Sequence, residues 1–286
     1  ETVLGSRFIL GPGGKGSNQA VACAKNGVKT SIITRLGKDD FANLAFNTWK
    51  EANVISLATQ DESRYTGSAF IFVQEGTGQN AVLVSPGAAS LITIQDVIDH
   101  SPDIEQASVF VTNFEVPIKA VEYSLNLARR AKVTTILNPA PAAEFPAGLL
   151  SLCDYVTPNE SEAEAITGLP VRSIEDAILV AHKLVELGAG ASVVTLGASG
   201  VVYYKNGKTL LVPAHAPAKV IDTTGAGDAF NGGFAAALAK GLSDEEALVY
   251  GSATAGISVT RMGTAPSMPV SSEVEKFVSS FELKEL

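Results

Sequence analysis

The chain contains very little cysteine and histidine. Of its 286 residues, two are cysteine and three are histidine. Cys23 and Cys153 lie far apart and form no Cys-x-x-Cys pair, so we expect two small buried side chains of a reducing compartment and no disulfide framework. With so little histidine and cysteine, the sequence offers little material for a metal site built from these residues.

Long cationic runs and long apolar runs are also missing. No run of lysine and arginine exceeds two residues, and the formal net charge is −9. This charge excludes sustained binding to nucleic acid or to an anionic membrane, although a local site can still hold a small phosphate ligand. No apolar stretch approaches the roughly 18 residues needed to span a bilayer. No signal peptide is visible either, so we expect a cytoplasmic protein; an organellar form stays open because the chain starts at Glu1.

Segments typical of strands and of helices alternate along most of the chain. Hydrophobic residues make up 46% of the sequence, which is enough for a sizeable core. The strand-like segments are 31–36, 54–59, 107–112, 134–137, 155–157 and 192–196, and the helix-like segments are 39–52, 118–131, 161–167, 174–187, 227–240 and 244–260. This alternation predicts an α/β fold with a mostly parallel sheet and helices on both of its faces.

Two hairpins interrupt the alternation. Segments 67–73 and 80–84 flank a glycine-containing loop at 75–79, and segments 201–204 and 209–212 flank the turn Asn206-Gly207. We expect the first hairpin, together with the glycine-rich N-terminus, to form a small sheet that projects from the main one. The predicted division is therefore a core of residues 14–65 and 86–286 and a projecting part of residues 1–13 and 66–85.

The stretch DTTGAGDAFNGG (222–233) is a loop of small residues that leads directly into a helix. Phe230, Phe234 and Leu238 recur every four residues, which predicts an apolar helix face that packs on a core. The small residues Gly225, Ala226 and Gly227 leave the first backbone N–H groups of that helix uncovered. Such a helix start binds anions.

Asp228 lies in the first turn of the same predicted helix, where a carboxylate is stabilised and stays ionised at neutral pH. A base beside an anion site suits phosphoryl transfer, because one group takes the proton of the acceptor while the other stabilises charge on the phosphoryl group. The structural alternative stays open at this point: a glycine-capped helix whose first-turn aspartate only stabilises the helix dipole.

Polar residues follow several of the predicted strands. In a parallel sheet these positions meet at one edge, where ligands bind. Each has a structural alternative: Asn159 caps the helix at 161 with Glu162 as its first-turn acid, and Glu115 is a solvated loop acid. The residues concerned are Asn113, Glu115, Asn138, Asn159, Glu162, Thr195 and Gly197.

A second glycine-rich stretch, GPGGKGSNQA, covers residues 11–20. It matches the dinucleotide pattern G-x-G-x-x-G, with an aspartate about 20 residues further on, but the preceding segment 7–10 is a short strand at best. A phosphate-binding Walker A loop is excluded because Gly16 follows Lys15 where serine or threonine is required. The stretch instead offers close backbone approach at Gly13 and Gly14, the cation of Lys15 and the amide of Asn18, which suit a polyhydroxylated ligand.

The motifs GGKGSNQA (13–20) and DTTGAGDAFNGG (222–233) resemble the two signatures of the ribokinase-like carbohydrate kinases. The resemblance continues, in order, through LNPAPA (137–142), TPNESEAE (157–164), VVTLGASG (193–200) and ISVTRMGTAPS (257–267). GGKGxN, NPAPA and TPNExEAE are more similar to the ribokinase branch than to fructokinase or adenosine kinase. The resemblance implies phosphorylation of D-ribose by ATP at the 5-hydroxyl, with a kinase of another pentose or a nucleoside as the alternative.

The resemblance also implies roles for particular residues. Asp228 takes the proton of the 5-hydroxyl, and the backbone amides of residues 225–228 stabilise the transferred phosphoryl group. The implied sugar-binding set is Gly14, Lys15, Asn18, Glu115 and Asp228, and the implied ATP-binding set is Asn159, Thr195, Gly197, Gly200, Gly227 and Ser252. Ser252 stands where ribokinases tend to carry histidine or asparagine near the adenine.

Two ions and one partner follow from the same resemblance. Glu162 would organise Mg²⁺ through water, and K⁺ would act as an activator. The implied monovalent-cation loop comprises Asp222, Thr224, Ser258, Arg261, Gly263 and Ser267, mostly through backbone carbonyls. The projecting hairpin would be the lid of the family, which closes over the sugar and often forms the contact of a homodimer.

One departure from the family pattern concerns the N-terminus. Family members begin with a core strand that carries an Asn-x-Asp pair for the sugar hydroxyls, whereas this sequence opens at Glu1, just after that strand. We expect the neighbouring strand edges to be left uncovered. Two interpretations stay open: the sequence is a fragment of a longer kinase, or it is a non-catalytic remnant that binds a sugar or nucleotide.

Overall fold

The computed structural model describes residues 6, 8–73, 80–214, 219–278 and 284–285. The predicted loop at 75–79 and most of the first seven residues lie outside this description. Within the described residues, no helix is both long enough and apolar enough to cross a membrane.

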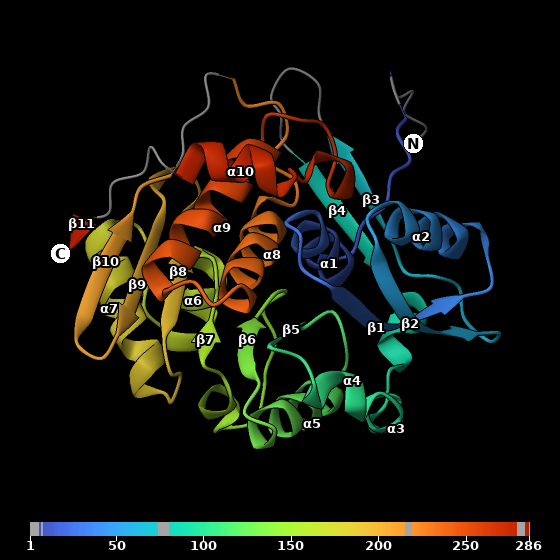
Figure 1. Cartoon of the computed structure of the whole chain (residues 1–286), viewed down its shortest axis with the longest axis horizontal. Coiled ribbons are helices and arrows are strands. Elements are labelled where there is room, and N and C mark those ends of the chain that lie inside the picture. The colour runs from blue at the N-terminus through green and yellow to red at the C-terminus, as the bar shows by residue number, and fades with distance from the viewer. Residues whose placement is uncertain (1–5, 7, 74–79, 215–218, 279–283, 286) are drawn as a thin grey trace.

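A seven-stranded sheet forms the main body of the molecule (Figure 1). Its strands lie in the order β11-β10-β9-β8-β7-β6-β5. Neighbouring strands from β5 to β8 run parallel, and those from β8 to β11 run antiparallel. The strands are β5 (Val109–Asn113), β6 (Thr134–Asn138), β7 (Tyr155–Val156), β8 (Ser192–Thr195), β9 (Val201–Lys205), β10 (Lys208–Val212) and β11 (Lys284–Glu285).

Helices cover both faces of this sheet, as the alternation predicts. Neighbouring residues of one strand enter different cores: Ile136 packs in the core under α8 (Ala226–Ala239), α9 (Asp244–Ser258) and α10 (Ser271–Val278). Leu137 packs in the core under α5 (Ile118–Arg130), α6 (Glu160–Thr167) and α7 (Ile174–Glu186). Because both faces are buried, neighbouring residues of a strand are apolar without alternation, as at Ile136-Leu137 of β6 and Val193-Val194 of β8. The α/β prediction is confirmed.

A smaller layer lies beside the main sheet (Figure 1). It comprises α1 (Lys15–Lys25), the parallel pair β1 (Thr30–Gly37) and β2 (Val54–Asp61), and α2 (Asp40–Glu51). Val21 and the fully buried Trp49 are part of its core. Two short helices, α3 (Ile94–Asp99) and α4 (Ser101–Glu105), connect this layer to β5.

The predicted projecting hairpin is present as an antiparallel sheet of its own. It consists of β3 (Ser68–Val73) and β4 (Asn80–Ser85), which pair from Ser68 opposite Ser85 to Val73 opposite Asn80. Large apolar side chains on it, such as Phe72 and Leu83, are exposed. The division of the chain into core and projecting part stays a prediction.

Among the strands that the structure describes, β5 and β1 each have a neighbour on one side only. β5 ends the main sheet on one side, and β1 pairs only with β2.

The sequence analysis did not predict α1. Gly14 precedes it with a backbone φ of +87°, a left-handed conformation that glycine adopts without strain. The buried residues of α1 are Asn18, Gln19, Ala20, Val21 and Ala22. Since two of these are amides, the helix lacks the apolar periodicity by which amphipathic helices are recognised.

Candidate active site

The site is built where α1 packs against the start of α8. A side chain on Gly232 would place its Cβ 2.4 Å from the Cβ of Ala22 and 2.6 Å from the carbonyl oxygen of Gln19. A Cβ on Gly233 would lie 2.3 Å from Oγ1 of Thr254 on α9. These two glycines therefore let α8 contact both neighbouring helices closely, which brings the first turn of α8 to the polar side chains of α1.

Asp228 is buried at this contact, with 7% of its surface exposed. Nδ2 of Asn18 donates to its Oδ2 at 2.8 Å, and Nε2 of Gln19 donates to its Oδ1 at 3.1 Å. Burial raises the pKa of Asp228 to about 6, although Lys15 and the two amides act to lower it. The carboxyl group is thus mostly ionised at pH 7, but its pKa is higher than that of a solvent-exposed aspartate in the first turn of a helix.

Lys15 and Glu115 lie beside this carboxylate. The backbone N–H of Lys15 donates to Oε2 of Glu115 at 2.8 Å, and the backbone N–H of Glu115 donates to Oδ1 of Asn113 at 2.9 Å. Glu115 is therefore held at the start of α1 although it is a half-buried loop acid, and its contact with a sugar stays a prediction. Lys15 lowers and Glu115 raises the pKa of Asp228, so both side chains act on the same carboxyl group.

The polar residues after the strands do meet at one edge of the main sheet. Asn113 stands opposite Asn138 in the register of β5 and β6. Nδ2 of Asn138 donates to the carbonyl of Thr157, which follows β7, at 2.9 Å. Oδ1 of Asn138 accepts from Gln19 at 3.1 Å. The carboxyl ends of the strands are thereby connected to α1.

The start of α8 has the geometry of an anion site. Gly225 caps it in the left-handed conformation, with φ of +78° and no side-chain hydrogen bond to the helix. The amide of Ala226 donates to the carbonyl of Thr223 at 3.2 Å. The amides of Gly227 and Asp228 meet no acceptor among the residues that the structure describes, and neither does that of the capping residue Gly225, so these amides are left as donors for an anion.

Asn159, Glu162 and Thr195 lie together at the start of α6. Oδ1 of Asn159 accepts from the amide of Glu162 at 2.9 Å, and Oε2 of Glu162 accepts from the amide of Asn159 at 3.0 Å. The capping alternative is therefore confirmed, and a contact of either residue with ATP stays a prediction. Thr195 forms a β-bridge with Asn159, and burial raises the pKa of Glu162.

The other residues of the predicted ATP-binding set form no hydrogen bond to Asn159, Glu162 or Thr195 among the described residues. Gly197 and Gly200 lie in the turn between β8 and β9 with φ of +51° and +96°. A Cβ on Gly200 would lie 2.1 Å from the carbonyl oxygen of Val212, so this position requires glycine. Ser252 on α9 is buried, and its Oγ has no partner within the described part of the chain.

Asp222 connects the two segments of the predicted cation loop. Its Oδ1 accepts from the amide of Thr224 and its Oδ2 from the amide of Gly263, both at 2.9 Å. These bonds lower the pKa of Asp222 against the effect of its burial. The hydroxyls of Ser258 and Ser267 donate to carbonyls within the same region, at 2.8 and 2.7 Å, and Arg261 forms an ion pair with Glu273.

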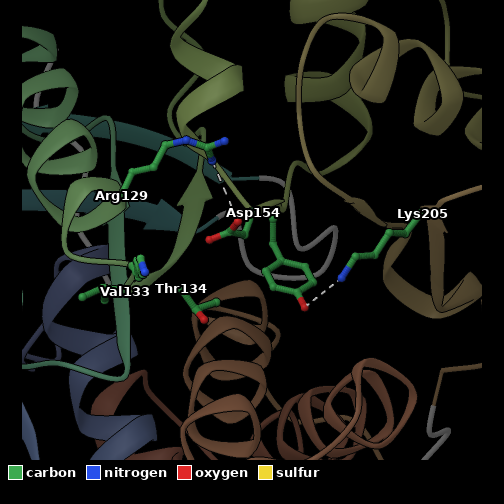
Figure 2. Close-up of a pocket in the computed structure, with 7 residues that line it drawn as sticks. Arg129, Val133, Thr134, Asp154 and Lys205 are labelled. Carbon is green, nitrogen blue, oxygen red and sulfur yellow. Dashed lines mark hydrogen bonds and ion pairs between the residues drawn. The ribbon is translucent and has the colours of Figure 1, made fainter.

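A cavity of about 520 Å³ lies at the opposite end of the main sheet, where β6 and β7 begin (Figure 2). Its charged side chains face each other: Arg129 lies 3.9 Å from Asp154, and Lys205 lies 2.8 Å from Asp244. The hydroxyl of Tyr155 donates to Asp244 at 2.5 Å. Because the cavity lies where β6 and β7 begin, away from the strand ends that meet α1, it is not part of the candidate site.

A buried base beside free amides at a helix start is the arrangement that the sequence motifs predict for a kinase. A family model described as pfkB family carbohydrate kinase matches residues 1–271. This chain belongs to the pfkB family of carbohydrate kinases. It is therefore a sugar kinase by family, and the resemblance stated from the motifs is confirmed.

Individual relatives within this family are similar over most of the chain. A ribokinase of Haemophilus influenzae is 36% identical over 279 residues, covering 97% of this chain and 90% of the relative. A ribokinase of Mus musculus is 37% identical, with 94% and 84% covered. A deoxyribokinase of Salmonella typhi is 32% identical, with 98% and 91% covered.

Solved structures show the same fold. The structure of Arabidopsis thaliana ribokinase complexed with ribose and ATP superposes with a TM-score of 0.90 at 29% identity, covering 97% of this chain and 91% of that one. A ribokinase structure from Thermotoga maritima has a TM-score of 0.86 at 35% identity, with 98% and 92% covered. The ribokinase-like fold expected from the motifs is confirmed.

Proposed function

We propose that this protein transfers the γ-phosphoryl group of ATP to the 5-hydroxyl of D-ribose and releases ribose 5-phosphate and ADP. The observation that carries the proposal is the buried carboxylate of Asp228 beside the free amides of Gly227 and Asp228. The carboxylate accepts the hydroxyl proton as the sugar oxygen bonds to the γ-phosphorus. The bond from that phosphorus to the leaving oxygen of ADP breaks, and the two amides stabilise the charge on the phosphoryl oxygens.

The choice of a sugar as acceptor rests on α1 and on the relatives. Oδ1 of Asn18 is buried and has no hydrogen-bond partner among the described residues, although Nδ2 of the same side chain is bonded to Asp228. A buried acceptor without a partner is costly unless a ligand supplies the donor, and a sugar hydroxyl does so. The similarity to ribokinases of Haemophilus influenzae, Mus musculus and Arabidopsis thaliana favours ribose over other sugars.

Mg²⁺ and K⁺ fit the residues that would hold them. Glu162 is a lone buried carboxylate, and no cluster of three or more metal-ligating side chains occurs in the described part of the chain. A single carboxylate suits a Mg²⁺ ion that is bound mainly by ATP phosphates and water, where the ion neutralises phosphate charge. Asp222 orders the loop at Thr224 and Gly263, and the carbonyls of that region would hold K⁺.

We also propose that the β3–β4 hairpin is a lid that pairs with the same hairpin of a second copy. Phe70, Phe72 and Leu83 are at least half exposed on it, and an exposed apolar sheet of this kind is otherwise prone to aggregation. Sedimentation velocity tests this: Phe72→Asp is expected to convert a dimer to a monomer, whereas Leu179→Asp, at an exposed leucine of α7, leaves the dimer intact. A monomeric wild-type protein would overturn the pairing.

Steady-state kinetics with ATP and a panel of acceptors test the proposed reaction in the full-length protein. Ribose is expected to give the highest kcat/KM, followed by 2-deoxyribose, with glucose and fructose poorer and adenosine inactive. The reason is that a site of hydrogen-bonding side chains rejects acceptors that leave them unpaired or that do not fit. Higher activity with fructose or adenosine would leave a kinase but overturn ribose as its substrate.

A further inference from the structure

Behind Asp228 lies a closed circuit of buried hydrogen bonds that none of the predicted site roles uses. Nε2 of Gln19 donates to Oδ1 of Asp228 and to Oδ1 of Asn138, both at 3.1 Å. Nδ2 of Asn138 then donates to the carbonyl of Thr157 at 2.9 Å. These bonds connect the carboxylate of Asp228, through α1, to the carboxyl ends of β6 and β7.

The circuit returns to the anion site through α8. Oγ1 of Thr157 donates to Oδ1 of Asn231 at 2.6 Å, and Nδ2 of Asn231 donates to the carbonyl of Gly227 at 2.9 Å. That carbonyl belongs to the same peptide group as the amide of Asp228, which is one of the free donors. We call Gln19, Asn138, Thr157 and Asn231 the polar circuit.

Every side chain of the polar circuit is buried, with between 1% and 7% of its surface exposed. Burying four polar side chains under a helix is unfavourable unless each finds a partner, and a fully bonded network then holds its members in one arrangement. An apolar core would pack α8 against the sheet equally well. Packing alone therefore does not require the circuit. Its hydrogen bonds, which have fixed directions, join the carboxylate of Asp228 to the peptide group that carries the anion donor.

We propose that Gln19, Thr157 and Asn231 are positioning residues that hold the Asp228 carboxylate and the Gly227–Asp228 peptide in one fixed relation. The inference rests on the proposed function, because it assigns these residues to the same reaction. Gln19 holds one carboxylate oxygen, so the base keeps its orientation when a sugar competes for Asn18. Asn231 holds the peptide whose N–H faces the phosphoryl group, so that donor is already aligned before ATP binds.

The charged and polar groups around Asp228 determine how its pKa should change when Gln19 is replaced. Lys15 on α1 and Glu115 after β5 face the carboxyl group, and on α1 the amides of Asn18 and Gln19 donate to it. Removing the Gln19 amide takes away a bond to the charged form and leaves the two charged neighbours in place. The pKa of Asp228 should therefore rise.

The experiment breaks the circuit at two of its four side chains in the full-length protein. Gln19→Met keeps the volume but removes the amide, and Thr157→Val removes one hydroxyl without changing shape. Thr135→Val is the matched control: Thr135 is also a buried threonine, on β6, but its hydroxyl bonds to the carbonyl of Leu152 and to the carboxylate and amide of Asp154, away from the site. Thr157→Ser keeps the hydroxyl and serves as the conservative variant.

Two readouts separate positioning from simple stabilisation. A ¹³C NMR titration of carboxyl-labelled aspartate, assigned with Asp228→Asn, should show the pKa of Asp228 rising by about one unit in Gln19→Met. At pH 7, kcat should fall about ten-fold in Gln19→Met and about three- to ten-fold in Thr157→Val, with KM for ATP within about two-fold. Thr157→Ser should keep at least about half of kcat, and Thr135→Val should lower only the melting temperature.

The proposal is overturned if Gln19→Met leaves the pKa of Asp228 unchanged, or if Thr157→Val matches Thr135→Val in kcat. If Gln19→Met does not fold, the comparison of the two threonine variants decides alone, because both substitutions conserve shape. A wild-type protein that phosphorylates no pentose would overturn the proposed function instead. The NMR titration would still show whether Gln19 controls the carboxyl group.

Discussion

Asp228 and Asp244 are first-turn acids of two helices that pack against each other, yet their surroundings differ completely. At the start of α9, Asp244 accepts from the hydroxyls of Tyr155 and Tyr203, both at 2.5 Å, and from Lys205 at 2.8 Å. These partners lower the pKa of Asp244 against the effect of its burial. At the start of α8, Asp228 has two neutral amides in direct contact, and burial raises its pKa to about 6.

The difference separates a structural acid from a reactive one. A carboxylate with a cation and two phenols around it is stable in its charged form and has no reason to accept a proton near neutral pH. A carboxylate that burial has made more basic accepts a proton more readily and is still mostly ionised at pH 7. The predictions below compare the two sites, from the largest expected effect to the smallest.

Removing the charge at each position should affect different properties. Asp228→Asn is expected to lower kcat by about 10²- to 10⁴-fold in the full-length protein, because the acceptor proton then has no base. The affinity for ATP should change little, since the residues predicted to bind the adenine and the ribose of ATP lie elsewhere. Asp244→Asn is the matched control, and kcat is measured for both; an Asp228→Asn variant that keeps more than about a third of wild-type kcat would exclude Asp228 as the base.

We expect the hydroxyl groups of the acceptor sugar to be bound by residues around Asp228 and not by residues around Asp244. If Lys15, Asn18 and Glu115 pair with the hydroxyls of ribose, the loss of one hydroxyl strands a buried polar group at a cost of about 1–3 kcal/mol. The kcat/KM for 2-deoxyribose should then be at least about ten-fold below that for ribose. Equal values for the two sugars would show that no side chain in the pocket pairs with the 2-hydroxyl.

A monovalent cation should influence the start of α8 and leave the start of α9 unaffected. Asp222 orders the loop beside α8 through the amides of Thr224 and Gly263. Replacing Na⁺ by K⁺ at equal ionic strength is expected to raise the rate several-fold, because a weakly hydrated ion fits a site of carbonyl ligands. Initial rates in the two salts decide the matter, since general screening treats both ions alike and predicts no difference.

The smallest effect should be on stability, through Asp244. Its pKa is lower in the folded protein than the ordinary value of 3.8, so its contribution is present above that value and is lost as the pH falls through the folded pKa. We expect Asp244→Asn to lower the free energy of unfolding by about 1–2 kcal/mol at pH 7. Urea unfolding at pH 7 and at about pH 3 measures it, and the difference from wild type should shrink at the lower pH.

Much of the fold and several site residues could be predicted from the sequence, because the relevant signals are local. The apolar runs of β5 to β8, the turn at Asn206-Gly207 and the apolar face of Phe230 and Phe234 each depend on neighbouring residues only. The two glycine-rich motifs predicted that the residues around Asn18 and Asp228 belong to one site, and the structure joins these two side chains by a hydrogen bond. The prediction was possible because each motif combines glycines that expose the backbone with a polar side chain suited to bind a ligand.

The polar circuit could not be predicted in the same way. Gln19 lies directly after Asn18 in a motif whose recognisable features are its glycines and its cation. Asn231 has the sequence context of an ordinary polar residue in an apolar helix. α1 was missed for the same reason, because it buries amides where a pattern analysis looks for apolar side chains. A buried polar residue has no sequence signature of its own, since its partners come from distant parts of the chain.

The two first-turn acids show where sequence information ends. Both aspartates lie in the first turn of a helix, where dipole effects depend on local position only, so their local sequence position does not distinguish them. Only the tertiary structure decides that Asp244 meets Lys205 and two tyrosines, whereas Asp228 is buried against α1 at the glycine contact of Gly232. Charge and burial act through space, so the same residue at the same place in a helix becomes structural in one case and, as we propose, catalytic in the other.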